Sequence, residues 1–161
     1  HIYQYERRMM MIFDSDDIAH PDLLGSQFRS VLNSGVTVLG VQIRFFGNST
    51  RTTSHPNKIT ADMVRNNEIY PYWFMNNPGV AIWLGDIGER YYPPVALPAS
   101  SDFAMWISLL NDGFDLYNRP EILVQYRWMG KNSNDRLTPE EKSMRMAHLE
   151  LIKNQLYENQ N

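Results

Sequence analysis

An apolar run near the beginning of the chain ends abruptly in carboxylates, and this junction strongly limits what the chain can fold into. Residues 9–13 are Met, Met, Met, Ile and Phe, and Asp14, Ser15, Asp16 and Asp17 follow directly. Such a short apolar run predicts a strand. Side chains two residues apart on an extended chain point the same way. Asp14 and Asp16 can therefore present their oxygens to one side, just beyond the end of this strand.

Two carboxylates at a strand end suit a hard divalent cation. Mg²⁺ or Mn²⁺ keeps open positions that waters or the oxygens of a diphosphate can fill, so the segment indicates phosphate-ester chemistry. The alternative is an ordinary turn, in which aspartate and serine side chains bond nearby backbone amides. An EF-hand is excluded, because Ala19 stands where the loop needs glycine and Gly25 where it needs glutamate.

Composition favours one domain and excludes several classes of function. With 161 residues, 43% of them hydrophobic, the chain can bury a core as a single domain over residues 1–161. The net charge of −3, with scattered Lys and Arg, argues against nucleic acid or an anionic membrane as a partner. Cysteine is absent, which excludes zinc thiolate sites and thiol nucleophiles and fits a cytoplasmic location. No apolar run approaches the roughly 20 residues that span a bilayer.

Strand and helix patterns alternate along the first half of the chain. Pro21 is suited to open a helix in which Leu24, Phe28 and Val31 have helical spacing, and Gly35 can end it. The other predicted elements of this half are a strand over 36–46, a polar loop over 47–57, a short helix over 60–66 and a strand over 79–85. Three prolines make residues 90–100 irregular. The pattern predicts an α/β layered domain.

Two helices and a strand are predicted in the second half. Ser101 can cap a helix over 102–111 whose apolar face includes Trp106. Residues 115–118 and 122–128 read as a bent strand or a strand pair around Pro120. Near the end, Thr138, Pro139 and Glu141 form a capping box before a long helix. Its predicted buried stripe consists of Met144, Ala147, Leu151 and either Gln155 or Leu156.

Three stretches, in this order, resemble the family 2 glycosyltransferases: residues 13–18 with Pro21 and Leu24, residues 101–106, and residues 122–127. Residues 75–80, followed by 85–88, resemble the segment that separates the first two in that family. The resemblance covers roughly residues 9–133. It implies a GT-A-like α/β layered domain of a nucleotide-sugar transferase. It also implies that the N-terminal nucleotide-binding half is missing, because only thirteen residues precede Asp14. That half would belong to the same polypeptide or to a partner chain.

The resemblance implies an inverting hexosyltransferase that moves a sugar from a nucleotide-sugar donor to a hydroxyl acceptor. Asp14 and Asp16 match the family's DxD motif, which binds Mn²⁺ or Mg²⁺ with the donor. Asp102 matches the general base that takes the proton of the acceptor hydroxyl. Arg127 matches a position from which its planar fork can steady the diphosphate. The sequence departs from the family at Met129, where many relatives carry a metal-binding histidine.

Aromatic residues suggest where an acceptor sugar could bind. Among the four tryptophans, Trp73 is the best candidate, because it lies in an aromatic stretch outside the predicted elements. Trp106 is interpreted as a core residue. His20 and His55 are interpreted as a helix-start residue and a loop residue rather than as metal ligands. The alternative function is a noncatalytic carbohydrate-binding or assembly module that keeps part of the transferase scaffold.

Overall fold

The computed structural model describes residues 8–70, 73–84, 101–130 and 137–158, and for Ser101 and residues 155–158 it describes the backbone alone. Its centre is one mixed sheet in the order β1-β5-β3-β6-β2, with β4 also paired to β6. The long strands β3 and β6 run parallel, and the other pairs are antiparallel. The strands are β1 Met9–Ile12, β2 Ile18–Ala19, β3 Val38–Gly47, β4 Lys58–Ile59, β5 Val80–Trp83 and β6 Leu116–Trp128.

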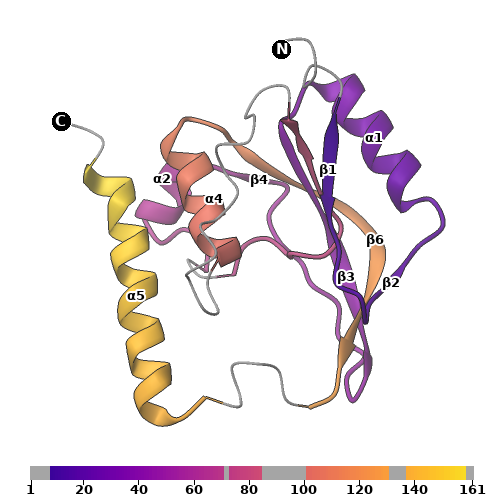
Figure 1. The fold of residues 1–161 in the computed structure, drawn as a ribbon. Helices are drawn as coiled ribbons and strands as arrows, with labels where there is room; N and C mark the ends of the chain where they lie inside the picture. Colours follow the sequence, from indigo (N-terminus) through magenta and orange to yellow (C-terminus); the bar gives the residue numbers. More distant parts are fainter. Residues whose placement is uncertain (1–7, 71–72, 85–100, 131–136, 159–161) are drawn as a thin grey trace.

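Helices cover both faces of the sheet (Figure 1). Helix α1 (Leu23–Ser34) lies on one side, where Val31 packs with Leu39 and Ala81. On the other side lie α2 (Ala61–Arg65), α4 (Ser101–Asn111) and α5 (Pro139–Glu158). The main core forms between these helices and the sheet. The domain is therefore mixed α/β, as the alternating pattern predicts.

Most predicted elements are confirmed, because local signals mark their ends. The capping box at the start of α5 is formed in both directions. The backbone N–H of Thr138 donates to Glu141 Oε2 at 2.7 Å, and the N–H of Glu141 donates to Thr138 Oγ1 at 3.2 Å. Thr60 caps α2 by accepting the N–H of Met63. Residues 90–100, predicted to be irregular, lie outside the described residues.

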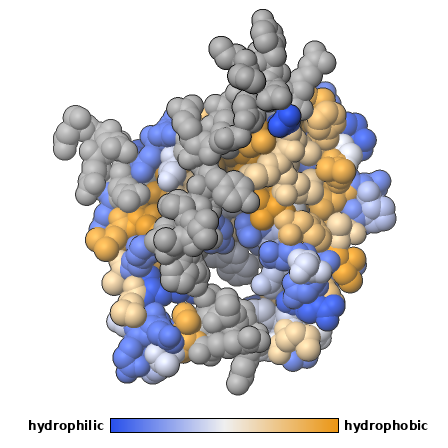
Figure 2. All heavy atoms as spheres, in the orientation of Figure 1, coloured by the Kyte–Doolittle hydropathy of each residue, from blue (hydrophilic) through white to orange (hydrophobic). Residues whose placement is uncertain are grey.

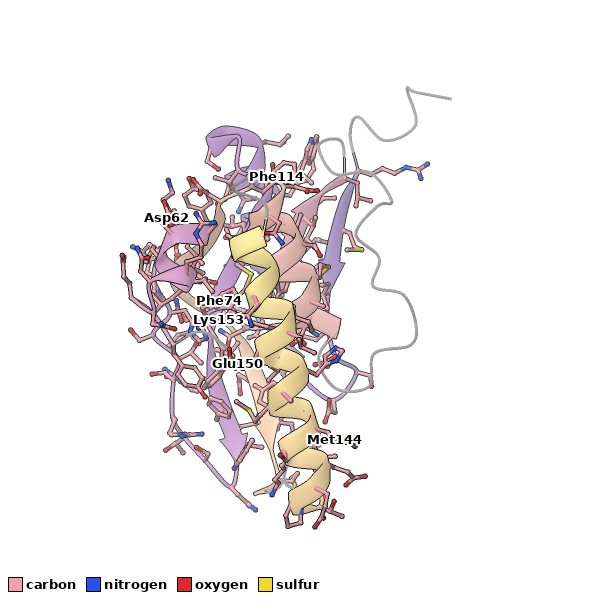
Figure 3. The ribbon with its side chains drawn as sticks, turned by 90° about the vertical axis from the view of Figure 1, so that its left-hand side faces the viewer. Asp62, Phe74, Phe114, Met144, Glu150 and Lys153 are labelled. Carbon is pink, nitrogen blue, oxygen red and sulfur yellow. The ribbon has the colours of Figure 1, made fainter. Side chains whose placement is uncertain are left out.

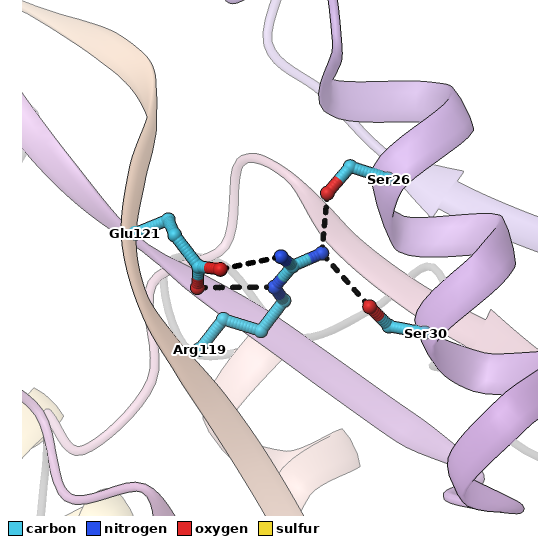
Figure 4. Close-up of polar contacts among 4 residues, drawn as sticks. All are labelled: Ser26, Ser30, Arg119 and Glu121. Atoms are coloured by element: carbon cyan, nitrogen blue, oxygen red, sulfur yellow. Dashed lines mark hydrogen bonds and ion pairs between the residues drawn. The ribbon is translucent and has the colours of Figure 1, made fainter.

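Strand β6 resolves the alternatives around Pro120. It is one strand from Leu116 to Trp128, and its pairing with β3 shifts register near Gln42, so the chain bends without breaking. Next to the proline, Arg119 fastens β6 to α1 (Figure 4). Its Nη1 donates to Ser26 Oγ and, at 2.9 Å, to Ser30 Oγ, while Nη2 lies 2.6 Å from Glu121 Oε1.

The buried face of α1 differs from a simple apolar stripe. Leu24 and Phe28 are 62% and 42% exposed, whereas Gln27 is fully buried. Gln27 Nε2 donates to the carbonyls of Leu39 and Gly79, both at 2.8 Å. The helix thus faces the sheet with a polar side chain that bonds to two strand-end carbonyls. Apolar residues remain at the surface around α1 and β1 (Figure 2).

The predicted buried stripe of α5 is wrong. Met144 and Leu151 are 68% and 67% exposed, and Ala147 is exposed as well. Gln155 and Leu156 have side chains outside the described set. The buried residues are instead Leu149, Ile152 and Lys153, because α5 packs on α4 and α2 through a different face. Figure 3 shows α5 on the outside of α4, with Lys153 and Met144 on different turns. Lys153 Nζ donates to Asn67 Oδ1 at 2.7 Å.

Candidate functional site: a carboxylate cluster beside an aromatic pocket

A tight turn after β1 carries the predicted metal ligands. The backbone N–H of Asp17 donates to the carbonyl of Asp14 at 3.3 Å. Strand β2 then pairs with β6, with Ile18 opposite Gln125. This pairing places the turn beside the last residues of β6, after Gln125. Asp17 Oδ1 accepts the backbone N–H of Arg127 at 2.8 Å, so β6 holds the turn in place.

The fourth carboxylate comes from a distant part of the chain. Asp102 lies in the first turn of α4, and its Oδ1 accepts the backbone N–H of Phe103 at 2.9 Å. Phe103 and Trp106 bury the inner face of α4 in the core, which confirms the prediction for Trp106. The charge of Asp102 acts on Asp14. The structure therefore brings the predicted base and the predicted DxD motif within electrostatic range.

The cluster is negatively charged, and its protonation equilibria reflect this. The pKa of Asp14 is raised, first by burial and then by the charges of Asp16 and Asp102. Burial is also the main cause that raises the pKa of Asp17, and Asp14 and Asp16 add to it, against the hydrogen bond from Arg127. Asp17 Oδ2 is buried and finds no hydrogen-bond partner among the residues that the structure describes. These carboxylates share one site, and Asp17 belongs to it although the DxD pattern does not include it.

Tyr126 borders the same cluster. Its pKa is raised by burial and then by the charges of Asp17, Asp14, Asp16 and Asp102 in turn. The phenol of Tyr126 thus lies within electrostatic range of all four carboxylates. The sequence predicts that Tyr126 lies in a strand, but it does not reveal which side chains surround the phenol.

Arg127 contacts the turn twice, because its backbone N–H bonds to the Asp17 carboxylate and its side chain bonds to a backbone carbonyl. Its Nε donates to the carbonyl of Asp16 at 3.1 Å, and its guanidinium lies over the ring of Phe46 at 5.1 Å. Among the described residues, its terminal nitrogens have no hydrogen-bond partner. The side chain is exposed, so these nitrogens can reach an anionic ligand beside the turn.

The carboxylates do not form a complete metal site by themselves. Within the described ranges, no group of three His, Cys, Asp or Glu side chains is arranged to hold a metal ion. Met129, the position at which the resemblance led us to look for a metal-binding histidine, is 63% exposed. A cation here would take one or two carboxylates from Asp14 and Asp16, and oxygens from outside the protein would complete its shell.

A pocket lies near the carboxylate cluster. Its volume is about 240 Å³, and its lining residues are Phe45, Arg51, Thr52, Thr53, Ser54, His55 and Trp73. The indole of Trp73 is 45% exposed, and its ring centroid lies 5.2 Å from that of His55, nearly perpendicular to it. Trp73, proposed from the sequence as a sugar platform, thus lies in a cavity, and His55 lies with it.

One aromatic pair joins the pocket to the cluster. Phe45 and Tyr126 are paired across the parallel strands β3 and β6, and their ring centroids are 5.4 Å apart. Phe45 lines the pocket, and Tyr126 borders the carboxylates. The sequence did not reveal this proximity, because it depends on the register of two strands that are far apart along the chain.

Comparisons with known proteins leave the function to be argued from this geometry. No protein-family model matches the chain, and no curated protein matches it. None of the helices in the described part combines the length and apolar character that crossing a membrane requires.

Proposed function

We propose that the chain forms the cation-binding and acceptor-binding part of an inverting glycosyltransferase with a GT-A-like domain. The observation that supports this proposal is that Asp14, Asp16 and Asp102, from two distant segments, lie within electrostatic range of Tyr126, and that Asp16 and Asp102 also act on Asp14. Single displacement at a sugar needs a base near the acceptor and stabilisation of charge near the leaving group. The cluster provides carboxylates for both tasks in one place.

In the proposed reaction, Asp102 takes the proton of an acceptor hydroxyl while that oxygen attacks the anomeric carbon of the donor. The bond from this carbon to the diphosphate breaks, the electron pair leaves with the diphosphate, and the configuration inverts. A bound Mn²⁺ or Mg²⁺ would stabilise the charge that develops on the leaving group. Asp14 and Asp16 would hold this cation, with diphosphate oxygens as further ligands. Arg127 would contact the same diphosphate from the side.

The proposal also requires a nucleotide-binding half, from the same polypeptide or from a partner chain. Strand β1 offers a place for it to join. It forms one edge of the sheet, and among the described strands it pairs only with β5. Its other edge can accept a further strand, which would extend the sheet towards the donor. An intact mass of the native protein, with every copurifying chain recorded, tests this part of the proposal.

The pocket at Trp73 favours one other function, that of a noncatalytic carbohydrate-binding module. An exposed indole in a small polar cavity can hold a sugar whether or not the carboxylates act on it. The two functions differ in their use of Asp16. Asp16→Asn removes transfer in the first case and leaves sugar binding nearly intact in the second.

Cation binding is the first test. Titration of the protein with Mn²⁺, followed by the electron paramagnetic resonance signal of the free ion, measures the affinity directly. We expect Asp16→Asn to weaken binding by at least about tenfold, equivalent to about 1.4 kcal/mol. The matched control is Asp112→Asn, an exposed aspartate after the end of α4. Equal affinities of the two variants would contradict the cation site.

Transfer is the second test. The native protein, with all its chains, is assayed with Mn²⁺ and a panel of nucleotide-sugars for release of nucleoside diphosphate. We expect Asp102→Asn to abolish release while Mn²⁺ affinity stays within about threefold of the wild type, because Asp102 is proposed as the base. Full turnover by Asp102→Asn would remove Asp102 from the proposal.

A further inference from the structure

We propose that the pocket between Phe45 and Trp73 binds one acidic sugar ring, with Trp73 packed against the ring and Arg51 paired with its carboxylate. The identification of this ring as part of the acceptor rests on the proposed function. The binding of the ring is independent of that function, because it needs neither the cation nor the donor.

The size of the pocket limits the ligand to about one ring. Its 240 Å³ lies below the roughly 300 to 1,000 Å³ typical of sites for drug-sized ligands. A nucleotide, with base, ribose and phosphate, is too large for it. The exposed indole of Trp73 supplies an apolar surface, and pyranose rings carry apolar C–H faces that pack on such surfaces. A single sugar ring therefore fits the space.

The charge of the pocket favours an anion. Among the described residues that line the pocket, Arg51 carries the only full charge, and none is a carboxylate. No ion pair within the described part of the chain involves Arg51, and its guanidinium lies over the ring of Phe45 at 5.1 Å. This contact holds the side chain at the wall and leaves its N–H groups for a ligand. A planar guanidinium suits a carboxylate, which accepts two parallel hydrogen bonds.

The pocket also holds neutral groups suited to sugar hydroxyls. Asn76 Nδ2 donates to the carbonyl of Val41 and to Thr53 Oγ1, so its Oδ1 is the acceptor that faces His55 Nε2 at 3.1 Å. The Nε2 of His55 thus carries the proton, and its Nδ1 carries a lone pair. Burial lowers the pKa of His55, which keeps the ring neutral at pH 7. Nδ1 can accept a hydrogen bond from a hydroxyl, and the exposed Thr52 and Ser54 hydroxyls can donate or accept hydrogen bonds.

The inner wall is fixed in advance by a buried network. Gln42 Oε1 accepts from Thr53 Oγ1 at 2.9 Å and from the backbone N–H of His55 at 3.0 Å. Gln42 Nε2 returns a bond to the carbonyl of His55 at 3.1 Å. The loop that carries Arg51 is thereby bound to β3 on both sides of Thr53. A wall that is already ordered loses little entropy when a ligand binds.

The test compares two probes that differ in one group. Methyl β-glucuronide and methyl β-glucoside share the ring and differ by a carboxylate in place of a hydroxymethyl. Affinity is measured by saturation-transfer NMR titration without donor or added metal. We expect the glucuronide to bind about tenfold more tightly, which corresponds to one charge-assisted bond of about 1.4 kcal/mol. Inorganic phosphate serves as a third probe for the charge alone.

Variants assign the binding to the pocket. Arg51→Gln should reduce the glucuronide to the affinity of the glucoside, and Arg51→Lys should restore part of the difference. Trp73→Ala should weaken both sugars. The matched control is Arg29→Gln, which makes the same change of charge on the exposed face of α1. Thermal unfolding of each variant verifies that it is folded.

Each outcome decides the matter. Equal binding of the two glycosides, a preference that survives Arg51→Gln, or phosphate binding as tight as that of the glucuronide would overturn the inference. Glucuronide binding that depends on Arg51 and Trp73 would support it, even if Mn²⁺ binding and transfer both fail. In that case the proposed function alone would be wrong, and the pocket would belong to a binding module.

Discussion

The replacement of Gly79 by alanine tests whether the close packing beside the end of β1 requires a glycine. Gly79 precedes β5, and its backbone is bonded on both sides. Its N–H donates to the carbonyl of Ile12 at 2.8 Å, and its carbonyl accepts Gln27 Nε2 at 2.8 Å. Its φ of +85° is a left-handed conformation. A Cβ at this position would lie 2.8 Å from Cγ2 of both Val41 and Val124.

The expected cost has two parts. An L-residue in the left-handed region costs about 1–2 kcal/mol. Crowding against two buried valines adds about 1–3 kcal/mol, because valine has few alternative rotamers in a strand. Gly113→Ala separates the two parts. Gly113 has a φ of +86°, and no atom of the described residues outside its chain neighbours lies within 4 Å of its Cβ position. Gly113→Ala should therefore cost only the first part.

The assay is urea unfolding followed by circular dichroism. We expect Gly79→Ala to lower the free energy of unfolding by about 2–5 kcal/mol and Gly113→Ala by about 1–2 kcal/mol. Val41→Ala should be less harmful in the Gly79→Ala background than in the wild type, because it removes one of the two crowded methyl contacts. Equal losses from the two glycine replacements would refute the argument, since the crowding would then have no measurable effect.

Three further predictions concern other parts of the structure. Gln27→Leu should lower the free energy of unfolding in urea by about 2 kcal/mol, because two buried carbonyls lose their donor. The loss is limited because the replacement also removes Gln27 Oε1, a buried oxygen without a partner among the described residues. Asn33→Leu on the exposed face of α1 is the control. The pKa of Asp14 is raised above 3.8, so the folded state binds its proton more tightly, and the stability contribution of this group falls as pH rises through the folded-state pKa. Asp14→Asn should therefore raise the free energy of unfolding at pH 7, by no more than about 1 kcal/mol after solvent screening, and this gain should disappear as the pH falls below 3.8. The measurement is thermal unfolding at a series of pH values, and a gain that stays constant with pH would contradict the assignment. Thr138→Ala should remove the capping box of α5 and cost about 1 kcal/mol, measured by thermal unfolding.

The sequence predicted elements wherever a short local signal was sufficient. The capping box at Thr138 and the apolar run of β1 are complete within a few residues, and both were confirmed. Burial was harder to predict, because it depends on which face of a helix meets the sheet. Leu24 is exposed and Gln27 is buried for this reason, since two strand-end carbonyls lie where α1 faces the sheet.

In the candidate site, too, local features could be predicted from the sequence and contacts between distant segments could not. The turn at Asp14 follows from the sequence of one segment, whereas its proximity to Asp102 was expected only from the resemblance to a family. The pocket was not foreseen, apart from Trp73. His55 enters it through a network with Asn76 that joins a loop to a distant strand end. No local pattern records such a network, and the roles of these residues remain predictions until the assays are done.

The arrangement of charges gives the carboxylate cluster a thermodynamic property that can be measured without knowledge of the substrate. The side chain of Arg127 bonds to the carbonyl of Asp16 and packs on Phe46. Burial and then repulsion by Asp16 and Asp102 raise the pKa of Asp14 in the folded state. A ligand that binds the folded state alone stabilises it in proportion to the logarithm of its concentration over its dissociation constant. Mn²⁺ at about 100 times its dissociation constant should add about 2.7 kcal/mol, and Asp16→Asn should remove most of this gain. An anion that binds the pocket around Arg51 should instead stabilise the folded state through that pocket. The two sites, which lie on either side of the Phe45–Tyr126 contact, can therefore be distinguished by the charge of the ligand that each one binds.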